Sequence, residues 1–545
     1  MKYLLCMACL LLLMFGVPAS AQQTKSFSQQ SYERARQVLD EGVRAIGDAQ
    51  NLEALGDIKL QYVARAVEIG QSANPAAPYY ITQAGGTRIL DFRGKRSYQE
   101  LNTHFLGDIP LRLREVVTEN GGFTVEMSSN AVYPIAAGAV AGSIRAAQSF
   151  FPQYLLASAL SRASSLRWLG VENYNGRRQN VIAFSSGDSP LTLYFDAKTH
   201  LLTRYESLGD SIAFGVAAFE TIFTDYRQTG TVKIPFRLTT RFAGELNTDL
   251  SYTSVNINTH PDDSLFEMPQ DAELGPTTGG NLSLAVTRLA PDVYYVNNGL
   301  SARGNFCLNN IFFYSQMFIV FNDYVLVIEA PRNDALSQAV IAKIKEMVPG
   351  KPIKYVALTH YHSDHLGGVR GFIAEGATVL TTPGNQRWIE RIASMPLPFN
   401  PDTLSRRPHP STIETFADRR VITDGEHTVV LYNIGSPHAD EMMIAYLPKQ
   451  KIVFASDIAG IFAFAPKNQI MLANPAIRAF VRKTEELGLE IETVASGHGR
   501  VFVMQELRKA VAQRVSAFAL RKGNKIVGPP VGWRRLKKSR NINIT

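Results

Sequence analysis

The chain opens with an apolar run that is shorter than a membrane span. Residues 3–17 are almost entirely apolar, Lys2 precedes them, and Ala19-Ser20-Ala21 supplies a small-residue site just after them. This order is typical of a secretory signal peptide, because a helix that crosses a bilayer needs ~20 apolar residues. We therefore predict that residues 1–21 are a signal peptide and that the protein is exported to the periplasm. An uncleaved membrane anchor is the alternative, and no later stretch is apolar enough to be a transmembrane segment.

The next region, residues 22–271, combines helical and strand patterns. Apolar spacing predicts an amphipathic helix over Gln29–Ala49, and an Ala- and Leu-rich stretch predicts a second helix over Ala146–Arg167. Most of the remaining region has strand patterns, with expected strands at Leu191–Phe195, Leu201–Tyr205, Ala218–Tyr226, Phe236–Phe242 and Leu250–Ile257. Short turns such as Asp196–His200 join consecutive strands, which indicates a curved antiparallel sheet with helices over its inner face.

The pattern changes after residues 274–281, where Gly, Pro and Thr disfavour both helix and strand. Expected strands at Val293–Val296, Tyr324–Ile328 and Tyr355–Thr359 then alternate with an amphipathic helix over Ala335–Val348. Such alternation is typical of an α/β layer structure. We therefore predict an α+β domain at residues 22–271, a linker at 272–283 and an α/β domain at 284–520.

Composition supports two folded domains and gives little indication of a partner. The 545 residues exceed what one hydrophobic core usually holds, and 45% are hydrophobic. The net charge is +8, and residues 521–545 carry eight basic side chains and no acidic one. The rest of the chain is close to neutral, so we expect a solvated basic tail and no nucleic-acid partner. The alternative is a tail that touches anionic lipid or nucleic acid. Once residues 1–21 are removed, Cys307 is the only cysteine, which excludes an intramolecular disulfide.

The strongest chemical signal is a group of four potential metal ligands that follows a predicted strand. They lie within six residues: His360, His362, Asp364 and His365. Alternate positions after a strand end can point the same way, while the next two residues turn into a helix and can serve a second ion. Imidazole is the usual nitrogen ligand of zinc, and one carboxylate keeps the charge of the cluster low.

Three further candidates lie downstream, each at the end of an apolar strand pattern. His438 lies in a loop between two such strands, Asp457 follows the strand Ile452–Ala455, and His498 follows Thr493–Ala495 in a glycine-flanked turn. A single histidine beside glycine is more often a structural turn residue. Their order after the first cluster makes them candidate ligands of the same site.

This order of ligands resembles the metallo-β-lactamase superfamily over roughly residues 284–520. The resemblance implies an αββα sandwich and two metal ions that share one bridging carboxylate, Asp457. The first ion would be held by His360, His362 and His438, and the second by Asp364, His365 and His498. Zinc is the expected metal, with iron or manganese as alternatives.

An aspartate rather than a cysteine at the bridging position resembles the glyoxalase-II, lactonase and alkylsulfatase-like branches. Glu329 departs from the family, which usually has Asp there, and we expect the longer acid to alter the support of the site. Two ions about 3.5–4 Å apart would share a water and lower its pKa toward ~7. The resemblance thus implies a hydrolase in which a metal-bridging hydroxide attacks a small-molecule ester, thioester or lactone, with Asp364 orienting the nucleophile.

Several alternatives stay open. The substrate could instead be a β-lactam amide or a sulfate ester, and a redox member of the superfamily would carry iron. The N-terminal region resembles periplasmic lipoprotein-carrier domains, which would make lipid binding the main function, or it is a scaffold without a ligand. Residues 386–413 form a Pro-rich insertion that either covers the metals as an apolar lid or packs on the scaffold. Tyr361 and Arg500 flank ligands and either touch substrate or lie on the surface.

Overall fold

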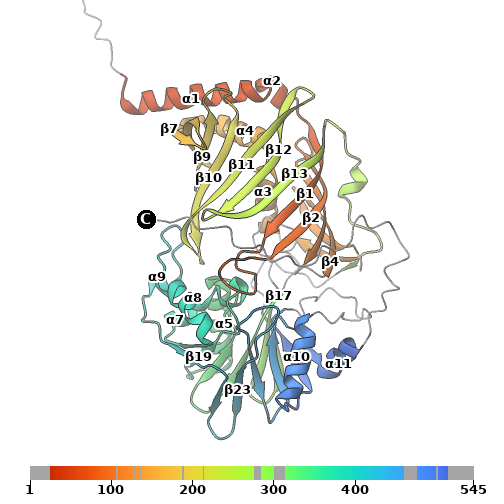
Figure 1. Cartoon of the computed structure of the whole chain (residues 1–545), viewed down its shortest axis with the longest axis vertical. Helices are drawn as coiled ribbons and strands as arrows, with labels where there is room; N and C mark the ends of the chain where they lie inside the picture. The colour runs from red at the N-terminus through yellow and green to blue at the C-terminus, as the bar shows by residue number, and fades with distance from the viewer. Residues whose placement is uncertain are drawn as a thin grey trace, which may run out of the picture.

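The computed structural model describes most of both halves of the chain. The described residues are 25–105, 109–127, 130–135, 137–186, 189–212, 214–274, 284–299, 313–458, 475–498 and 501–512. The predicted signal peptide, Cys307, Arg500, the basic tail and most of the predicted linker lie outside them. Figure 1 shows an upper half built on one curved sheet and a lower half in which helices flank two sheets.

The upper half contains one 14-stranded sheet, in the order β14-β6-β5-β4-β3-β2-β1-β13-β12-β11-β10-β9-β8-β7. Every neighbouring pair is antiparallel except β14 with β6, so the predicted antiparallel sheet is confirmed. The strands are β1 (Asp57–Val67), β2 (Ile81–Asp91), β3 (Arg96–Phe105), β4 (Ile109–Thr118), β5 (Gly121–Glu126), β6 (Ala131–Ile135), β7 (Arg167–Tyr174), β8 (Arg177–Ser186), β9 (Ser189–Asp196), β10 (Leu202–Ser211), β11 (Gly215–Thr229), β12 (Val232–Phe242), β13 (Glu245–Ile257) and β14 (Glu273–Leu274).

Helices cover one face of this sheet and complete its core. α1 (Phe27–Ile46) begins with a capping box between Ser26 and Gln29 and buries the predicted stripe of Val38, Leu39, Val43 and Ile46. The stripe packs with α4 (Pro152–Ser161) against apolar side chains of the strands, which confirms that helices line the sheet. Burial of such a continuous apolar surface is the main force that holds helix to sheet.

Both predicted helices of the upper half are interrupted, which the hydropathy pattern did not predict. The first predicted helix is broken at Gly47, which has a φ of 136° that glycine adopts without steric cost. A short helix, α2 (Asp48–Glu53), follows. The second predicted helix, Ala146–Arg167, overlaps two separate helices, α3 (Ala137–Gln148) and α4. Its last predicted residue, Arg167, is already the first residue of β7. Pro152 explains the second break, because proline lacks a backbone N–H and fits the first turn of a new helix.

The lower half has the predicted αββα layers. One sheet has the order β15-β16-β17-β18-β19-β20-β21 and the other the order β22-β23-β24-β25-β26-β27. The strands are β15 (Leu284–Ala290), β16 (Val293–Gly299), β17 (Phe313–Val320), β18 (Val325–Ile328), β19 (Ile353–Ala357), β20 (Thr378–Thr381), β21 (Ile413–Thr415), β22 (Arg419–Thr423), β23 (Thr428–Asn433), β24 (Met443–Leu447), β25 (Ile452–Ser456), β26 (Thr493–Ser496) and β27 (Val501–Val503).

Three apolar layers hold this sandwich together. One lies between the two sheets, the second between the first sheet and its helices, and the third between the second sheet and its helices. The helices are α5 (Asp334–Met347), α6 (Ser363–Leu366), α7 (Val369–Ala374), α8 (Pro383–Ser394), α9 (Thr403–Arg406), α10 (Pro475–Glu486) and α11 (Met504–Ala512). Figure 1 shows α5, α7 and α8 on one side and α10 and α11 on the other.

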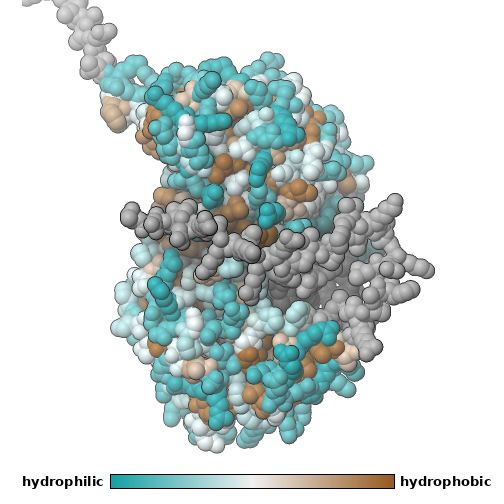
Figure 2. Space-filling model, in the orientation of Figure 1, coloured by the Kyte–Doolittle hydropathy of each residue, from teal (hydrophilic) through white to brown (hydrophobic). Residues whose placement is uncertain are grey.

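The two halves meet through the β1–β2 loop, which we define as residues 68–80. Figure 1 shows this loop reaching from the upper sheet to the lower half. The surface in view is a mixture of hydrophilic and hydrophobic residues on both halves (Figure 2). Within the described part of the chain, every helix is too short or too polar to meet the length and hydropathy of a membrane span.

Candidate metal centre

Seven side chains from four separate segments of the chain converge at one edge of the sandwich. They form two groups of possible metal ligands that share Asp457. The first group contains His360, His362 and His438 with Asp457, and the second contains Asp364, His365 and His498 with Asp457. Within each group, one ligand atom from every residue lies within 4.8 Å of the others. All the candidates that the sequence indicated are therefore brought together.

Strand ends and tight turns place these side chains. β19 ends at Ala357 and leads into His360 and His362, and His362 precedes the first turn of α6, which carries Asp364 and His365. The turn is possible because glycines follow it: a Cβ on Gly367 would lie 2.0 Å from the Arg332 carbonyl oxygen. The sequence pattern of a strand that ends in a ligand-bearing loop is thus the physical basis of the cluster.

The downstream ligands also follow strand ends. His438 lies between β23 and β24, and Asp457 directly follows β25. His498 follows β26, where the Ser496 hydroxyl accepts a hydrogen bond from the His498 backbone N–H at 2.9 Å. Parallel β25 and β26 are neighbours, so their carboxyl ends bring Asp457 and His498 to the same edge. Asp457 Oδ1 lies 3.2 Å from His498 Nε2 and 2.8 Å from His365 Nε2.

The first group presents three buried ring nitrogens that make no hydrogen bond. His360 Nε2, His362 Nδ1 and His438 Nε2 are buried and make no hydrogen bond. A buried polar atom without a partner costs free energy, so three that face one point require an explanation. A cation with nitrogen ligands supplies one, because three imidazoles and a carboxylate form a tetrahedral zinc ligand set. The residues present therefore fit a metal ion at this point.

Burial and local charge make the two groups differ in protonation. Burial lowers the pKa of His362 to about 3 and that of His360 well below its usual value. Burial also acts on His498, yet Asp457 and Asp364 outweigh it and raise its pKa to about 10. His360 and His362 of the first group are thus neutral imidazoles, whereas a proton on His498 balances the carboxylates of the second group.

A buried network supports the ligands from behind, and sequence reasoning found only part of it. Glu329, flagged as a departure from the family, lies with Oε2 3.2 Å from His365 Nδ1 and accepts a 2.7 Å hydrogen bond from Ser456. The Thr359 hydroxyl donates to Glu329 and lies 2.9 Å from His360 Nδ1. Thr359 and Ser456 were missed because a single hydroxyl at a strand end carries no distinguishing pattern.

Tyr361 does not lie on the surface, which was one of its two predicted placements. It is 2% exposed, and its hydroxyl donates to the backbone carbonyl oxygens of Ser72 and Asn74 in the β1–β2 loop. The prediction that Tyr361 lies on the surface is therefore wrong, and its polar tip contacts the other half of the protein instead of solvent. The side chain is buried because the loop covers it.

The Pro-rich insertion is held to the scaffold rather than placed freely over the ligands. Arg370 on α7 donates to the carbonyl oxygens of Ile392, Ala393 and Met395, each at 2.9 Å. The same guanidinium pairs with Asp402, whose burial is outweighed by this pairing so that its pKa is lowered. Trp388 lies edge-on to Tyr361 with ring centroids 6.3 Å apart. The alternative in which the insertion packs on the scaffold is thus the one that these contacts favour.

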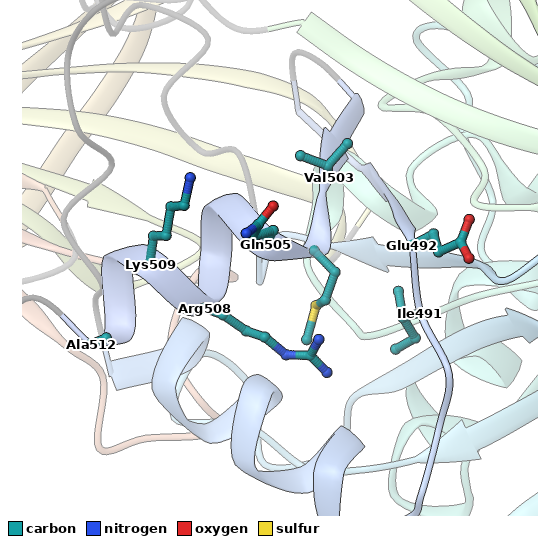
Figure 3. Close-up of a pocket in the computed structure, with 8 residues that line it drawn as sticks. Ile491, Glu492, Val503, Gln505, Arg508, Lys509 and Ala512 are labelled. Carbon is teal, nitrogen blue, oxygen red and sulfur yellow. The ribbon is translucent and has the colours of Figure 1, made fainter.

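The larger cavities among the described residues lie outside the ligand cluster. A cavity of about 690 Å³ lies against α11, and Figure 3 shows Arg508 extending from that helix toward Ile491 and Glu492. None of its lining residues belongs to either ligand group. The second, of about 530 Å³, lies on the upper sheet between strands that include β1, β2 and β10 to β13.

Comparisons with known proteins agree with the ligand pattern. Residues 319–498 match the family model described as the metallo-beta-lactamase superfamily. Among the similar solved structures are a metallo-beta-lactamase from Pontibacter korlensis (17% identity, TM-score 0.32, covering 42% of this chain and 98% of that one) and a metallo beta lactamase from Hirschia baltica (17%, 0.31, 42% and 96%). A third is the DIM-1 metallo-beta-lactamase exposed to ceftazidime (14%, 0.32, 42% and 95%). No curated protein sequence matches the chain significantly. The matched residues 319–498 include every ligand of both groups.

Proposed function

We propose that this protein is an exported, binuclear metal-dependent hydrolase of esters, thioesters or lactones. One observation carries the proposal: two groups of buried ligands share Asp457, and the first presents three unpartnered ring nitrogens. When bound, divalent cations supply a water nucleophile at neutral pH and polarise the substrate oxygen. Zinc suits this set of imidazole and carboxylate ligands best.

The protein's own residues hold and orient the reacting groups. Asp457 lies between the two ligand groups, 3.2 Å from both His438 Nε2 and His498 Nε2, and would place the two cations side by side. Asp364 Oδ2 lies 3.3 Å from His498 Nε2, and this carboxylate would help to hold the second cation and orient the nucleophile. Glu329 and Thr359 fix the imidazole rings of the ligands from behind.

The test combines metal analysis with a substrate panel. Purified wild-type protein should hold two zinc equivalents and cleave activated esters, thioesters or lactones. His362→Ala should lose metal and activity together, whereas His409→Ala, an exposed histidine outside both groups, should keep both. Wild-type protein without stoichiometric metal, or an active His362→Ala variant, would refute the proposal. Parallel assays with a β-lactam and a sulfate ester distinguish the substrate classes.

A second candidate function is the binding of an apolar ligand by the upper sheet. The cavity of about 530 Å³ is lined by aromatic and aliphatic side chains together with polar and charged ones, among them Arg88, Glu220 and Arg241. Its size suits a small-molecule ligand, and its lining suits an acyl chain. Native mass spectrometry of the purified protein should then detect a bound acyl species, and a ligand-free spectrum would count against this candidate.

A further inference from the structure

The β1–β2 loop of the upper sheet contacts both ligand groups of the lower half. In the loop, the Gln71 side-chain amide donates a 2.8 Å hydrogen bond to Asp364 Oδ1. The Ser72 backbone carbonyl oxygen lies 2.8 Å from His362 Nε2. Each contact is made to a different ligand group, although the two loop residues are adjacent in sequence. We propose that this loop is a positioning element that sets the metal affinity of both groups, an inference that rests on the proposed function.

The contact with His362 decides which ring nitrogen faces the cluster. A carbonyl oxygen only accepts, so His362 Nε2 must carry the hydrogen that it donates to Ser72. The neutral ring then has its lone pair on Nδ1, and Nδ1 is the atom that lies buried without a partner among the ligands. The loop therefore selects the tautomer in which His362 is ready to bind a cation.

The contact with Asp364 decides which carboxylate oxygen faces the cluster. The charged carboxylate accepts from the Gln71 amide through Oδ1. Its other oxygen, Oδ2, lies 3.4 Å from His365 Nε2 and 3.3 Å from His498 Nε2. Gln71 thus holds the carboxylate in the rotation that presents one oxygen to the second group, and the carboxylate cannot turn without losing this bond.

The loop is rigid enough for this role because its own contacts fix it at both ends. The Ser72 hydroxyl is buried, donates to the Glu68 carbonyl oxygen and accepts from the Tyr80 backbone N–H, both at 2.8 Å. On the lower half, the Asp440 backbone N–H donates to the Ala73 carbonyl oxygen at 3.0 Å. These bonds close the loop and dock it beside the ligands.

The loop could also act only by joining the two halves, without any effect of its contacts with the ligands. A contact between the halves that involves no ligand serves as the control. The Tyr80 hydroxyl donates to the Pro437 carbonyl oxygen at 3.1 Å, a contact between the halves that touches no ligand. Tyr80→Phe removes this docking bond and leaves Gln71 and Ser72 in place. Gln71→Ala removes the contact with Asp364, and Ser72→Ala loosens the loop that positions the carbonyl oxygen next to His362.

The experiment measures zinc affinity of the full-length variants by competition with a chromophoric chelator. We expect Gln71→Ala to lower the affinity for one of the two zinc equivalents by about 10- to 100-fold, which is the usual effect of losing a residue that orients a ligand. Gln71→Asn, whose amide is one methylene short, should show a partial loss. Tyr80→Phe should leave both equivalents within about twofold of wild type, because neither ligand group loses a contact.

A double-variant series assigns each effect to its ligand group. In a His498→Ala background, which lacks a ligand of the second group, Gln71→Ala should have no further effect on the remaining equivalent. Ser72→Ala should still weaken it. Cobalt absorption spectra of the same variants report the ligand geometry independently of activity.

The outcomes separate this inference from the proposed function. If wild-type protein binds two zinc equivalents and Gln71→Ala binds both equally well, the loop is not a positioning element. If Tyr80→Phe weakens binding as much as Gln71→Ala does, the loop acts only by docking the halves, and the inference is also wrong. If wild-type protein binds no zinc, the proposed function fails and the inference fails with it.

Discussion

The two ligand groups share Asp457 but are supported by partners of different charge. In the first group, His360 contacts the Thr359 hydroxyl and His362 contacts the Ser72 carbonyl oxygen, both of which are neutral. In the second group, His365 lies beside the carboxylate of Glu329. Neutral support leaves a buried imidazole unprotonated, whereas a carboxylate favours the imidazolium.

Because of this difference, the two groups should bind a metal ion with different consequences for the protons of their ligands. The first group is prepared for a cation because three of its buried ring nitrogens make no hydrogen bond. The second group keeps protons until a cation replaces them, since the pKa of His498 is raised to about 10. Metal binding to the second group must therefore release protons, and binding to the first need not.

The change with the largest expected effect removes the shared ligand. Asp457→Ala should reduce hydrolysis on the order of 10³-fold or more, because both groups lose a ligand and metal catalysis contributes several kcal/mol. Zinc analysis should find fewer than two equivalents. Asp418→Asn, an exposed acid of the lower half, serves as the control and should behave as wild type. A variant that kept two zinc equivalents would show that the groups do not depend on a common carboxylate.

The second prediction uses pH to separate the two groups. Zinc and a proton compete for the same nitrogen, so zinc affinity rises with pH wherever the metal-free imidazole is protonated. His498, with its pKa raised to about 10, stays protonated from pH 6 to 8, and affinity should rise at least about tenfold per pH unit. His362, with its pKa lowered to about 3, is unprotonated throughout this pH range. The affinity for the zinc equivalent in the first group should therefore stay nearly constant.

Chelator competition at pH 6, 7 and 8 measures both equivalents in one series. If the affinities for the two zinc equivalents changed equally with pH, the two groups would not differ in protonation as proposed. The same series on His498→Ala should retain only the flat component, because burial lowers the pKa values of His360 and His362 in the remaining intact group.

The third prediction concerns the charged support of the second group. Glu329→Gln keeps the size of the side chain but removes the charge that lies 3.2 Å from His365 Nδ1. We expect about a tenfold loss of zinc affinity in the pH-dependent equivalent and little change in the other. Glu414→Gln, a partly exposed acid on β21, is the matched control. Equal losses in both equivalents would mean that Glu329 supports the whole cluster rather than one group.

The ligands themselves could be predicted from sequence because they follow local rules. Each one lies just after an apolar strand pattern, and strand ends of neighbouring strands meet at one edge. Glu329 was also identified, since it departs from the family at a known position. The αββα layers followed from the alternation of strands and helices together with the resemblance.

The contributions of the upper half could not be predicted in the same way. Ser72 acts through its backbone carbonyl oxygen, which every residue has, and Gln71 lies 293 positions from its partner Asp364. The strand order has the same origin: β1 pairs with β13, for example Ile58 with Ile257, and hydropathy shows that a strand exists but not which strand it pairs with. Gly47 and Pro152 break helices by backbone geometry, which apolar spacing does not register.

The smallest expected effect tests the neutral support of the first group. Thr359→Val keeps the shape of the side chain but removes the hydroxyl that links His360 to Glu329 and Ser456. Zinc affinity should fall only a few-fold, because His360 keeps its burial and its place at the strand end. The free energy of unfolding should fall by about 1–3 kcal/mol, since buried polar atoms lose a partner. Thr428→Val, on the neighbouring sheet, is the control for the substitution itself. If Thr359→Val lowered the affinity for the pH-dependent zinc equivalent instead of the pH-independent one, Thr359 would act through Glu329 on His365. The partners that support the two ligand groups would then form one network rather than two.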